Sequence, residues 1–322
     1  MQAIQIDRTG GPDVLKLVTV ADPVPGPGQA LIRIEASGVN FIDTYFREGR
    51  YPAVLPYTLG QEAAGTIAGL GEGVDGFAVG DRVAWCGIPG TYAEMAVAPV
   101  ARLIKVPEEV TTQQAAAAIL QGMTAHYLLY STYVPQFGDR VLIHAGAGGT
   151  GLLLIQMAKR LGVHVITTVS TAEKALLARG AGADDVILYT EEDLVARVKE
   201  IAGGEGLPVV YDSVGKATFE QSLRCLCPRG MLVLFGGASG AVPPFDLIRL
   251  STMGSLYVTR PTLKDYIATR ADLVQRARDV FRWVADGSLR LRIAHTYALA
   301  EAAEAHRDLE SRKTTGKLLL LP

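Results

Sequence analysis

Two patterns of hydrophobic and polar positions divide the chain. In the first hundred residues, short alternating or apolar runs are separated by clusters of glycine and proline, such as residues 23–28 and 69–73. Short runs bounded by such clusters are typical of strands and turns, so they predict a β-rich unit. The strands expected from these runs cover residues 15–20, 29–35, 63–67, 82–85, 92–97 and 102–106.

From about residue 122 to residue 263, apolar runs alternate with segments of helical periodicity. This alternation is typical of a parallel sheet covered by helices, since parallel strands need crossover connections. The first helices expected are residues 152–161 and 171–179. Six strands are expected, at residues 141–144, 163–169, 186–189, 207–212, 230–235 and 255–258.

The two patterns meet at a helix start. Thr111 and Gln114 stand in a capping-box pattern, which predicts a helix through Leu120 that carries the chain into the second unit. Another helix is expected at 269–285, and the tail 297–322 returns to strand and helix patterns. We expect this tail to fold back on the first unit.

Length and composition limit what the chain can be. Apolar residues make up 49% and charged residues 20%, and the net charge of −2 does not indicate nucleic acid as a partner. No apolar segment reaches the ~18 residues of a membrane helix, and the N-terminus lacks the features of a targeting peptide. We therefore expect a cytoplasmic protein that does not enter membranes. Its 322 residues suffice for two domains, expected at residues 1–121 with 264–322 and at residues 122–263.

A glycine-rich turn follows the first strand of the second unit. Gly146, Gly148 and Gly151 have the G-x-G-x-x-G spacing and lead into the helix at 152–161. Glycines allow a sharp turn and a close approach to a pyrophosphate, and the helix start offers unpaired N–H groups and a positive dipole end. The pattern predicts a dinucleotide site. A glycine turn without a ligand stays open, because the chain has 35 glycines.

The residues after the next strand indicate which dinucleotide binds. In dinucleotide-binding proteins, an Asp or Glu about 20 residues after the glycines accepts hydrogen bonds from the adenosine ribose. Ser170 and Thr171 stand at this place, and Lys174 follows one helical turn later. Hydroxyls and an ammonium attract a 2′-phosphate that a carboxylate would repel, so the pattern favours NADPH over NADH. A solvated helix lysine is the alternative for Lys174, because Glu173 stands beside it.

Several motifs carry a family resemblance. They are the glycine turn with His144 before it and the segments 38–45, 80–83, 121–125 and 309–312. Over its whole length the chain is similar to the zinc-independent NADPH:quinone oxidoreductases, a branch of the medium-chain dehydrogenase/reductase superfamily that includes the ζ-crystallins. The resemblance implies an α/β fold: a Rossmann domain with a doubly wound parallel sheet, and a β-rich GroES-like catalytic domain. It also implies NADPH in the cleft and a homodimer joined near residues 254–258.

The resemblance implies a site without metal. Zinc-dependent members of the superfamily hold their metal with Cys and His, whereas this chain has Asn40 and Gln61 where a cysteine and a histidine would stand. No histidine precedes His126, and Cys86 is the only cysteine in the first two hundred residues. The three cysteines give no disulfide framework and no structural zinc lobe. Without a Lewis acid or flavin, the site suits reduction of an electron-poor acceptor.

By the same resemblance, the catalytic candidates are Asn40, Asp43, Tyr45 and Tyr51. Asn40 and Asp43 line the nicotinamide end, and the Tyr51 phenol donates a hydrogen bond to the acceptor oxygen. The alternative for Tyr51 is packing in the loop before Pro52. The cofactor-binding candidates are Phe41, Ile42, Thr124, Tyr127, Gly148, Gly149, Thr150, Gly151, Ser170, Lys174, Tyr189, Val214, Phe235, Gly236, Gly237, Val258 and Arg312.

These candidates divide by the part of NADPH that they contact. The residues 148–151 cover the pyrophosphate, and the residues 235–237 with Val258 form the floor near the nicotinamide. The 2′-phosphate group lies among Ser170, Lys174, Tyr189 and Arg312, which requires the tail to close over the cofactor. For Tyr127 an ordinary place in the helix core is the alternative.

Three functions stay open from the sequence. The first is reduction of quinones by hydride transfer from NADPH, and the second is reduction of α,β-unsaturated carbonyl compounds at the same cofactor site. The third is an NADPH-binding protein with a crystallin-like or single-stranded nucleic-acid-binding role, against which the mildly acidic composition and the intact site residues argue. His126 and His144 are expected to be buried structural histidines rather than catalysts.

Overall fold

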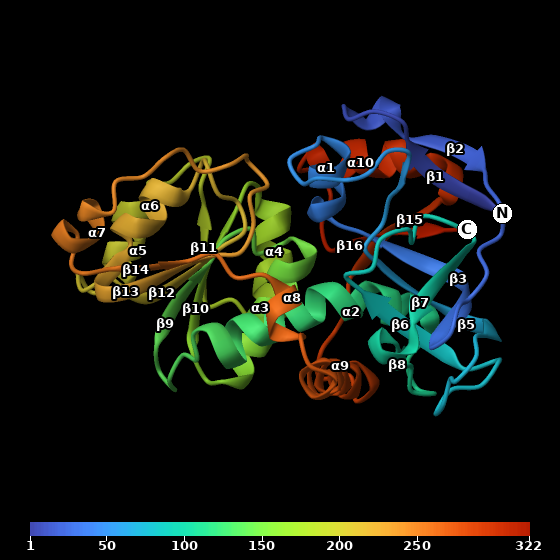
Figure 1. Ribbon diagram of the computed structural model, residues 1–322. Helices are drawn as coiled ribbons and strands as arrows, with labels where there is room; N and C mark the ends of the chain where they lie inside the picture. The colour runs from blue at the N-terminus through green and yellow to red at the C-terminus, as the bar shows by residue number, and fades with distance from the viewer. The chain divides into compact units, whose positions relative to one another are not determined.

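The computed structural model describes residues 1–322, and the chain forms two compact units (Figure 1). The first unit contains residues 1–123 and 267–322, and the second contains residues 124–266. None of the helices combines the length and the apolar character that crossing a membrane requires.

The first unit contains two sheets of mainly antiparallel strands. Its strands are β1 (Gln2–Ile6), β2 (Lys16–Thr19), β3 (Gln29–Val39), β4 (Tyr57–Thr58), β5 (Glu62–Leu70), β6 (Arg82–Cys86), β7 (Met95–Pro99), β8 (Ile104–Lys105), β15 (Ile293–Ala298) and β16 (Lys317–Leu321). The larger sheet has the order β15-β16-β3-β5-β6-β8, and β7 also pairs with β3. The smaller sheet has the order β2-β1-β4. Because β16 pairs with β3, the C-terminal strand lies inside the larger sheet.

One helix of the first unit was not expected from the sequence. The helices are α1 (Phe41–Arg47), α9 (Arg270–Ala285) and α10 (Ala302–Glu310), with single turns η1 (Pro12–Val14), η2 (Val100–Arg102) and η4 (Leu299–Glu301). α1 begins directly after β3, where the Asp43 carboxylate accepts a hydrogen bond of 2.9 Å from the Asn40 N–H. This side chain satisfies a backbone donor at the helix start, so a short helix can follow a strand without a loop.

The strand expected at 92–97 is wrong at its start. The structure places β7 at Met95–Pro99, and Tyr92 lies in the segment before it. The Tyr92 N–H donates to the Leu59 carbonyl at 2.9 Å, and its carbonyl accepts from the Ile4 N–H at 2.8 Å. These bonds use both backbone groups of Tyr92 outside the β3–β7 ladder. The buried Tyr92 therefore joins the segments of Ile4 and Leu59 instead of extending β7.

The capping-box prediction is confirmed. The Thr111 N–H donates to Gln114 Oε1 at 2.9 Å, and the Gln114 N–H donates to Thr111 Oγ1 at 3.2 Å. Helix α2 (Thr112–Tyr127) begins there and continues beyond Leu120, ending in the π-helical turn η3 (Leu128–Thr132). Its interior is alanine-rich and buried, which allows close packing along the helix.

The six-stranded parallel sheet predicted for the second unit is confirmed. Its strands are β9 (Arg140–Ile143), β10 (His164–Val169), β11 (Asp185–Leu188), β12 (Leu207–Asp212), β13 (Leu226–Leu234) and β14 (Tyr257–Thr259). The helices are α3 (Gly149–Arg160), α4 (Ala172–Gly180), α5 (Leu194–Ile201), α6 (Phe219–Arg224), α7 (Ile248–Thr252) and α8 (Leu263–Tyr266). α3 and α4 cover one face of the sheet, and α5 and α6 cover the other (Figure 1). Such a doubly covered sheet has apolar strands, and the side chains of its core are buried.

The strand order locates a binding position on this sheet. The order is β11-β10-β9-β12-β13-β14, so the chain runs outward from β9 in one direction and then returns to build the other half from β12. A crevice opens at the carboxyl ends of the strands where the order reverses, and ligands of such sheets bind there. In this unit that position lies after β9 and β12.

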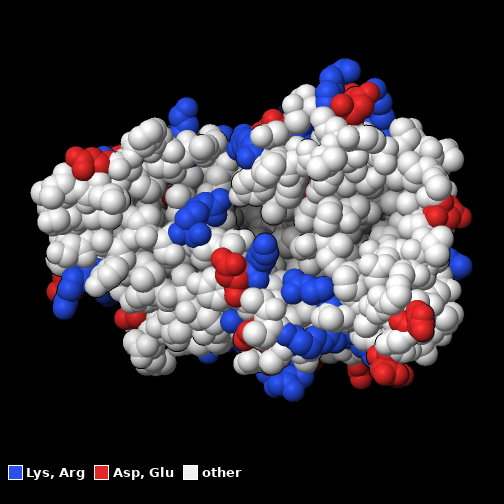
Figure 2. Space-filling view, viewed as in Figure 1, with Lys and Arg blue, Asp and Glu red and all other residues white.

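Charged side chains are scattered over the surface shown in Figure 2. Lys and Arg occur in separate groups, with uncharged surface and acidic side chains between them. The chain has 31 basic and 33 acidic residues, so no large excess of either sign is available. The face shown in Figure 2 therefore lacks the continuous basic surface that is typical of nucleic-acid binding.

Candidate functional site

Two glycines of the turn after β9 have no room for a side chain. A Cβ atom built on Gly151 would lie 2.2 Å from the Ala145 carbonyl oxygen, and one on Gly146 would lie 2.1 Å from Thr167 Oγ1. Ala145 itself has a φ of 56°, in the left-handed region. No side chain caps α3, which starts at Gly149 after the N-cap residue Gly148. The first N–H groups of α3, including that of Thr150, can therefore serve an anion.

A buried hydrogen-bond chain holds this turn in place. His144 follows β9, and its Nδ1 and Nε2 each lie 3.0 Å from a hydroxyl oxygen, of Thr168 and Ser222 respectively. Ser222 Oγ donates onward to Asp212 Oδ2 at 2.9 Å. Burial lowers the pKa of His144, so the ring is held neutral. The predicted structural role of His144 is confirmed, because both ring nitrogens are engaged in joining β9, β10 and α6.

The loops after β12 and β13 lie close together at the same edge of the sheet. Asp212 Oδ1 accepts hydrogen bonds from the N–H groups of Val214 at 2.7 Å and Gly215 at 3.0 Å. A Cβ atom built on Gly236 would lie 2.3 Å from the Ser213 carbonyl oxygen. The half-buried candidates Val214, Phe235, Gly236 and Gly237 are thus brought together in these two loops.

The candidates for the 2′-phosphate end lie after β10 and β11. Lys174 Nζ donates to Ser170 Oγ at 3.3 Å, and burial lowers the pKa of Lys174. Thr190 Oγ1 donates to the Ser170 carbonyl at 3.2 Å, which brings the exposed Tyr189 beside this pair. Three of the four candidates therefore share one edge of the sheet. Arg312 belongs to the first unit, where it follows α10 and has a φ of 61°.

The remaining candidates of the second unit have different surroundings. Thr124 is half-buried on α2, and Val258 is 37% exposed on the edge strand β14. Tyr127 is buried, and its ring stacks on that of Tyr266 with centroids 4.3 Å apart. Packing of this kind favours the helix-core role for Tyr127.

The other candidates of the first unit lie on α1 or close to its ends. Phe41 and Ile42 are half-buried in its first turn, while Asn40, Asp43 and Tyr45 are buried. Tyr51 is 36% exposed and meets the ring of Tyr45 edge-on with centroids 5.5 Å apart. The structure thus brings together all of the catalytic candidates at one short helix.

The sequence did not predict the buried ion pair that contacts the side chain of Asn40. Lys317 Nζ donates to Asn40 Oδ1 at 2.8 Å and also pairs with Glu62 Oε2. Asn40 Nδ2 donates to the same Glu62 oxygen at 2.9 Å, and the side chains of Lys317 and Glu62 are 3% and 0% exposed. A lysine near the C-terminus gives no local signal of such a place, because it arises only when β16 enters the sheet beside β3.

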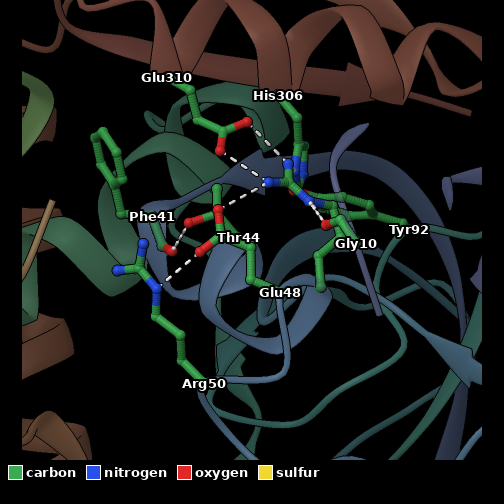
Figure 3. A network of polar contacts seen from close by, with 9 residues as sticks. Gly10, Phe41, Thr44, Glu48, Arg50, Tyr92, His306 and Glu310 are labelled. Atoms are coloured by element: carbon green, nitrogen blue, oxygen red, sulfur yellow. Dashed lines mark hydrogen bonds and ion pairs between the residues drawn. The ribbon is translucent and has the colours of Figure 1, made fainter. Parts of the chain in front are cut away.

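A second buried group, around Arg47, was also missed. Arg47 is 1% exposed and donates to Gly10 O at 3.0 Å and to both carboxylate oxygens of Glu310 at 2.8 and 2.9 Å. His306 and Glu310 both come from α10 (Figure 3), and Arg47 Nη1 also lies 3.0 Å from His306 Nδ1. Arg47 Nη2 also donates to Glu48 Oε1 at 3.1 Å. Arg47 therefore fastens α1 to α10 and to the N-terminal segment.

Two sequence families match the chain. Residues 26–108 match the alcohol dehydrogenase GroES-like domain, and residues 149–283 match the zinc-binding dehydrogenase family. The side chains of this chain do not fit the metal in the second name, because no group of three or more His, Cys, Asp or Glu could hold an ion. The amide of Gln61, at one of the expected ligand positions, instead donates to the Tyr57 hydroxyl at 3.0 Å.

Known proteins match the chain from end to end. A quinone oxidoreductase of Pseudomonas aeruginosa is 48% identical, with 99% of both chains covered. A 2-haloacrylate reductase of Burkholderia sp is 43% identical, with 100% of this chain and 99% of that protein covered. The solved structure of Escherichia coli quinone oxidoreductase complexed with NADPH has a TM-score of 0.98 and 44% identity, with 100% of both chains covered. The chain therefore belongs to the quinone oxidoreductase family of the medium-chain dehydrogenase/reductase superfamily, as its motifs predicted.

Proposed function

We propose that this chain reduces quinones with NADPH and uses neither zinc nor flavin. The observation that carries the proposal is the uncapped glycine turn after β9, at the reversal of strand order, with Ser170 and Lys174 at the neighbouring strand end. A pyrophosphate fits the turn, and a 2′-phosphate fits the hydroxyl and ammonium. The NADPH complex of the similar Escherichia coli quinone oxidoreductase supports the same cofactor.

The reaction assigns simple tasks to the protein. Bound NADPH supplies the hydride, so the chain's residues have to bind, orient and exclude water. We propose that the residues 148–151 and Val214 hold the cofactor, together with the 235–237 loop. Asn40 and Asp43 are proposed for the nicotinamide end, and Tyr51 for a hydrogen bond to the oxygen on which negative charge develops.

A spectrophotometric screen tests the proposal. The purified chain is expected to oxidise NADPH with benzoquinones and naphthoquinones, and to contain less than stoichiometric zinc by elemental analysis. NADH serves as the matched control, because it lacks only the 2′-phosphate. No NADPH oxidation with any acceptor, or one zinc per chain that activity requires, would contradict the proposal.

One observation favours a second acceptor class. The similar Burkholderia protein is named a 2-haloacrylate reductase, and a haloacrylate is an alkene made electron-poor by its carboxylate. A hydride acceptor of either kind gains negative charge that the same donors could stabilise. Including enones and haloacrylates in the screen decides between the classes, since turnover with alkenes and none with quinones would replace the first proposal by the second.

The phosphate candidates give a selective prediction. Lys174→Ala and Arg312→Ala are each expected to weaken NADPH binding by about 10-fold, because each loses a charge-assisted contact to the 2′-phosphate. NADH affinity should be nearly unchanged in both variants. Fluorescence titration of the two nucleotides measures this difference. An equal loss for NADH and NADPH would refute the assignment.

Tyr51 gives a prediction about turnover. Tyr51→Phe keeps the ring that packs on Tyr45 but removes the hydroxyl. We expect kcat to fall about 10-fold through loss of one hydrogen bond to the acceptor, with NADPH affinity unchanged. Tyr133→Phe is the matched control, since that half-buried tyrosine of the second unit belongs to none of the proposed sites. Unchanged turnover of Tyr51→Phe with the best acceptor would remove Tyr51 from the mechanism.

We also propose that the chain forms a homodimer through the edge strand β14 and acts in the cytoplasm. Tyr257 on that strand is 56% exposed, and the nearby Leu247 and Ile248 are 73% and 63% exposed. An exposed strand edge beside apolar side chains suits pairing with a second copy. The three unpaired cysteines suit a reducing compartment. Light scattering reports the molar mass, and a monomer at micromolar concentration would contradict the dimer.

A further inference from the structure

A hydrogen-bond chain with a fixed direction runs from Arg47 to Asp43. A guanidinium only donates, so His306 Nδ1, 3.0 Å from Arg47 Nη1, has to accept. The ring hydrogen then sits on Nε2, which lies 3.1 Å from the Tyr92 hydroxyl. That hydroxyl has one hydrogen, and it donates to Asp43 Oδ2 at 3.0 Å. Figure 3 shows the side chains of His306 and Tyr92 close to each other.

The middle members of the chain keep their protonation at neutral pH. Burial and the neighbouring Arg47 lower the pKa of His306 to about 3. Protonation would also point a second N–H at the guanidinium and break their hydrogen bond. Burial raises the pKa of Tyr92 well above its ordinary value. Neither residue changes charge near neutral pH, so each hydrogen bond between Arg47 and Asp43 keeps the same donor and acceptor.

Asp43 at the end of the chain is different. Its Oδ2 accepts from both Tyr92 and the Asn40 N–H, whereas its buried Oδ1 has no hydrogen-bond partner. In the charged carboxylate, the buried Oδ1 would carry negative charge with no hydrogen-bond donor facing it. A proton on Oδ1 removes that charge. Burial raises the pKa of Asp43 to about 7, so this proton is exchanged in the neutral range.

The other groups that face Asp43 act in both directions. Glu62 on β5 raises its pKa through repulsion, and Lys317 on β16 lowers it through attraction. Lys317 is already paired with Glu62, so one buried ammonium serves two buried carboxyl groups. Tyr57 on β4 also faces Asp43: burial raises the pKa of this phenol to about 12, and the Asp43 carboxyl adds to the shift. The charge balance of the cluster therefore favours one neutral carboxyl.

We propose that Arg47, His306 and Tyr92 are positioning residues that fix the Asp43 carboxyl with a proton on Oδ1, so that reduction requires the neutral acid. The inference rests on the proposed function, in which Asp43 lies at the nicotinamide end. An acceptor gains negative charge when it receives a hydride, and a carboxylate at the start of α1 would repel that charge. The neutral acid removes this repulsion.

An infrared titration of the protein without nucleotide tests the placement of the proton. The carbonyl band of the protonated Asp43 carboxyl is identified by its absence in Asp43→Asn. As the pH rises, this band is expected to disappear with a midpoint near pH 7. Tyr92→Phe removes a donor that favours the carboxylate, so the midpoint should rise by about one unit. Tyr297→Phe is the matched control, because it removes a similar bond, of 2.7 Å to Asp308, elsewhere in the first unit. A midpoint near pH 4 would overturn the proposal.

The pH dependence of NADPH oxidation with 1,4-naphthoquinone tests the consequence. Activity should fall as the pH rises through 7. In Tyr92→Phe, this falling limb of the pH–activity profile should move to higher pH by the same amount as the infrared midpoint. His306→Gln can accept from Arg47 and donate to Tyr92, so it should keep the wild-type limb, whereas His306→Leu should not. A limb that stays in place while the midpoint moves would overturn the proposal. Absence of turnover at every pH would instead contradict the proposed function, and the infrared titration would still decide whether Asp43 holds a proton at neutral pH.

Discussion

Replacing Lys317 by Met is expected to destabilise the first unit by about 3–5 kcal/mol, because it leaves Glu62 charged and buried without its partner. The side chains of both residues are at most 3% exposed, and each also binds Asn40. The loss therefore also frees the amide that the proposed site uses. Urea unfolding followed by circular dichroism measures the change.

Two further variants make this prediction specific. Lys313→Met changes an exposed lysine of the same tail and is expected to alter stability by less than about 0.5 kcal/mol. Adding Glu62→Gln to Lys317→Met should recover part of the loss, since a neutral amide is less costly to bury than an unpaired carboxylate. Equal stabilities of Lys317→Met and Lys313→Met would show that the buried pair contributes nothing.

Replacing Gly151 by Ala is expected to weaken NADPH binding by roughly 100-fold. The added Cβ would meet the Ala145 carbonyl at 2.2 Å, and only a displaced turn could relieve that contact. Displacement would remove about two charge-assisted hydrogen bonds from the start of α3 to the pyrophosphate, or roughly 3 kcal/mol. Isothermal titration calorimetry with NADPH measures the loss.

The matched control is Gly180→Ala at the end of α4. A Cβ atom built there meets nothing within 4 Å, so affinity for NADPH should stay at the wild-type value. NADH should lose affinity in Gly151→Ala by the same factor as NADPH, because the pyrophosphate is common to both. Wild-type affinity in Gly151→Ala, with the fold intact by circular dichroism, would place the pyrophosphate elsewhere.

Local pattern was sufficient for much of the fold. The strand, glycine turn and helix at 141–161 were predictable because period, turn chemistry and helix start are all encoded within twenty residues. The Thr111–Gln114 capping box likewise depends on neighbours three residues apart. The helix α1 was not predicted, since it is a short helix that follows β3 without a loop and depends on a single side-chain cap.

The candidate site divides along the same line. Glycines and the Ser170–Lys174 pair belong to one β-α-β unit, and their spacing in the sequence already places them at neighbouring strand ends. The placement of Asp43 beside Tyr92 and His306 depends on segments up to 263 residues apart in sequence, which no local pattern relates. Burial shifts the pKa values of these three side chains, and they become buried only when the distant segments pack together.

The sequence by itself thus determined the class of fold and the glycine turn after β9, because these follow from short-range order, and it predicted a preference for a 2′-phosphate from the same short segment. The tertiary structure alone decided which polar side chains become buried together: Lys317 with Glu62, and Arg47 with His306. Burial removes water from around ionisable groups and strengthens the effect of neighbouring charges and hydrogen bonds on their pKa values, and burial is a property of long-range packing.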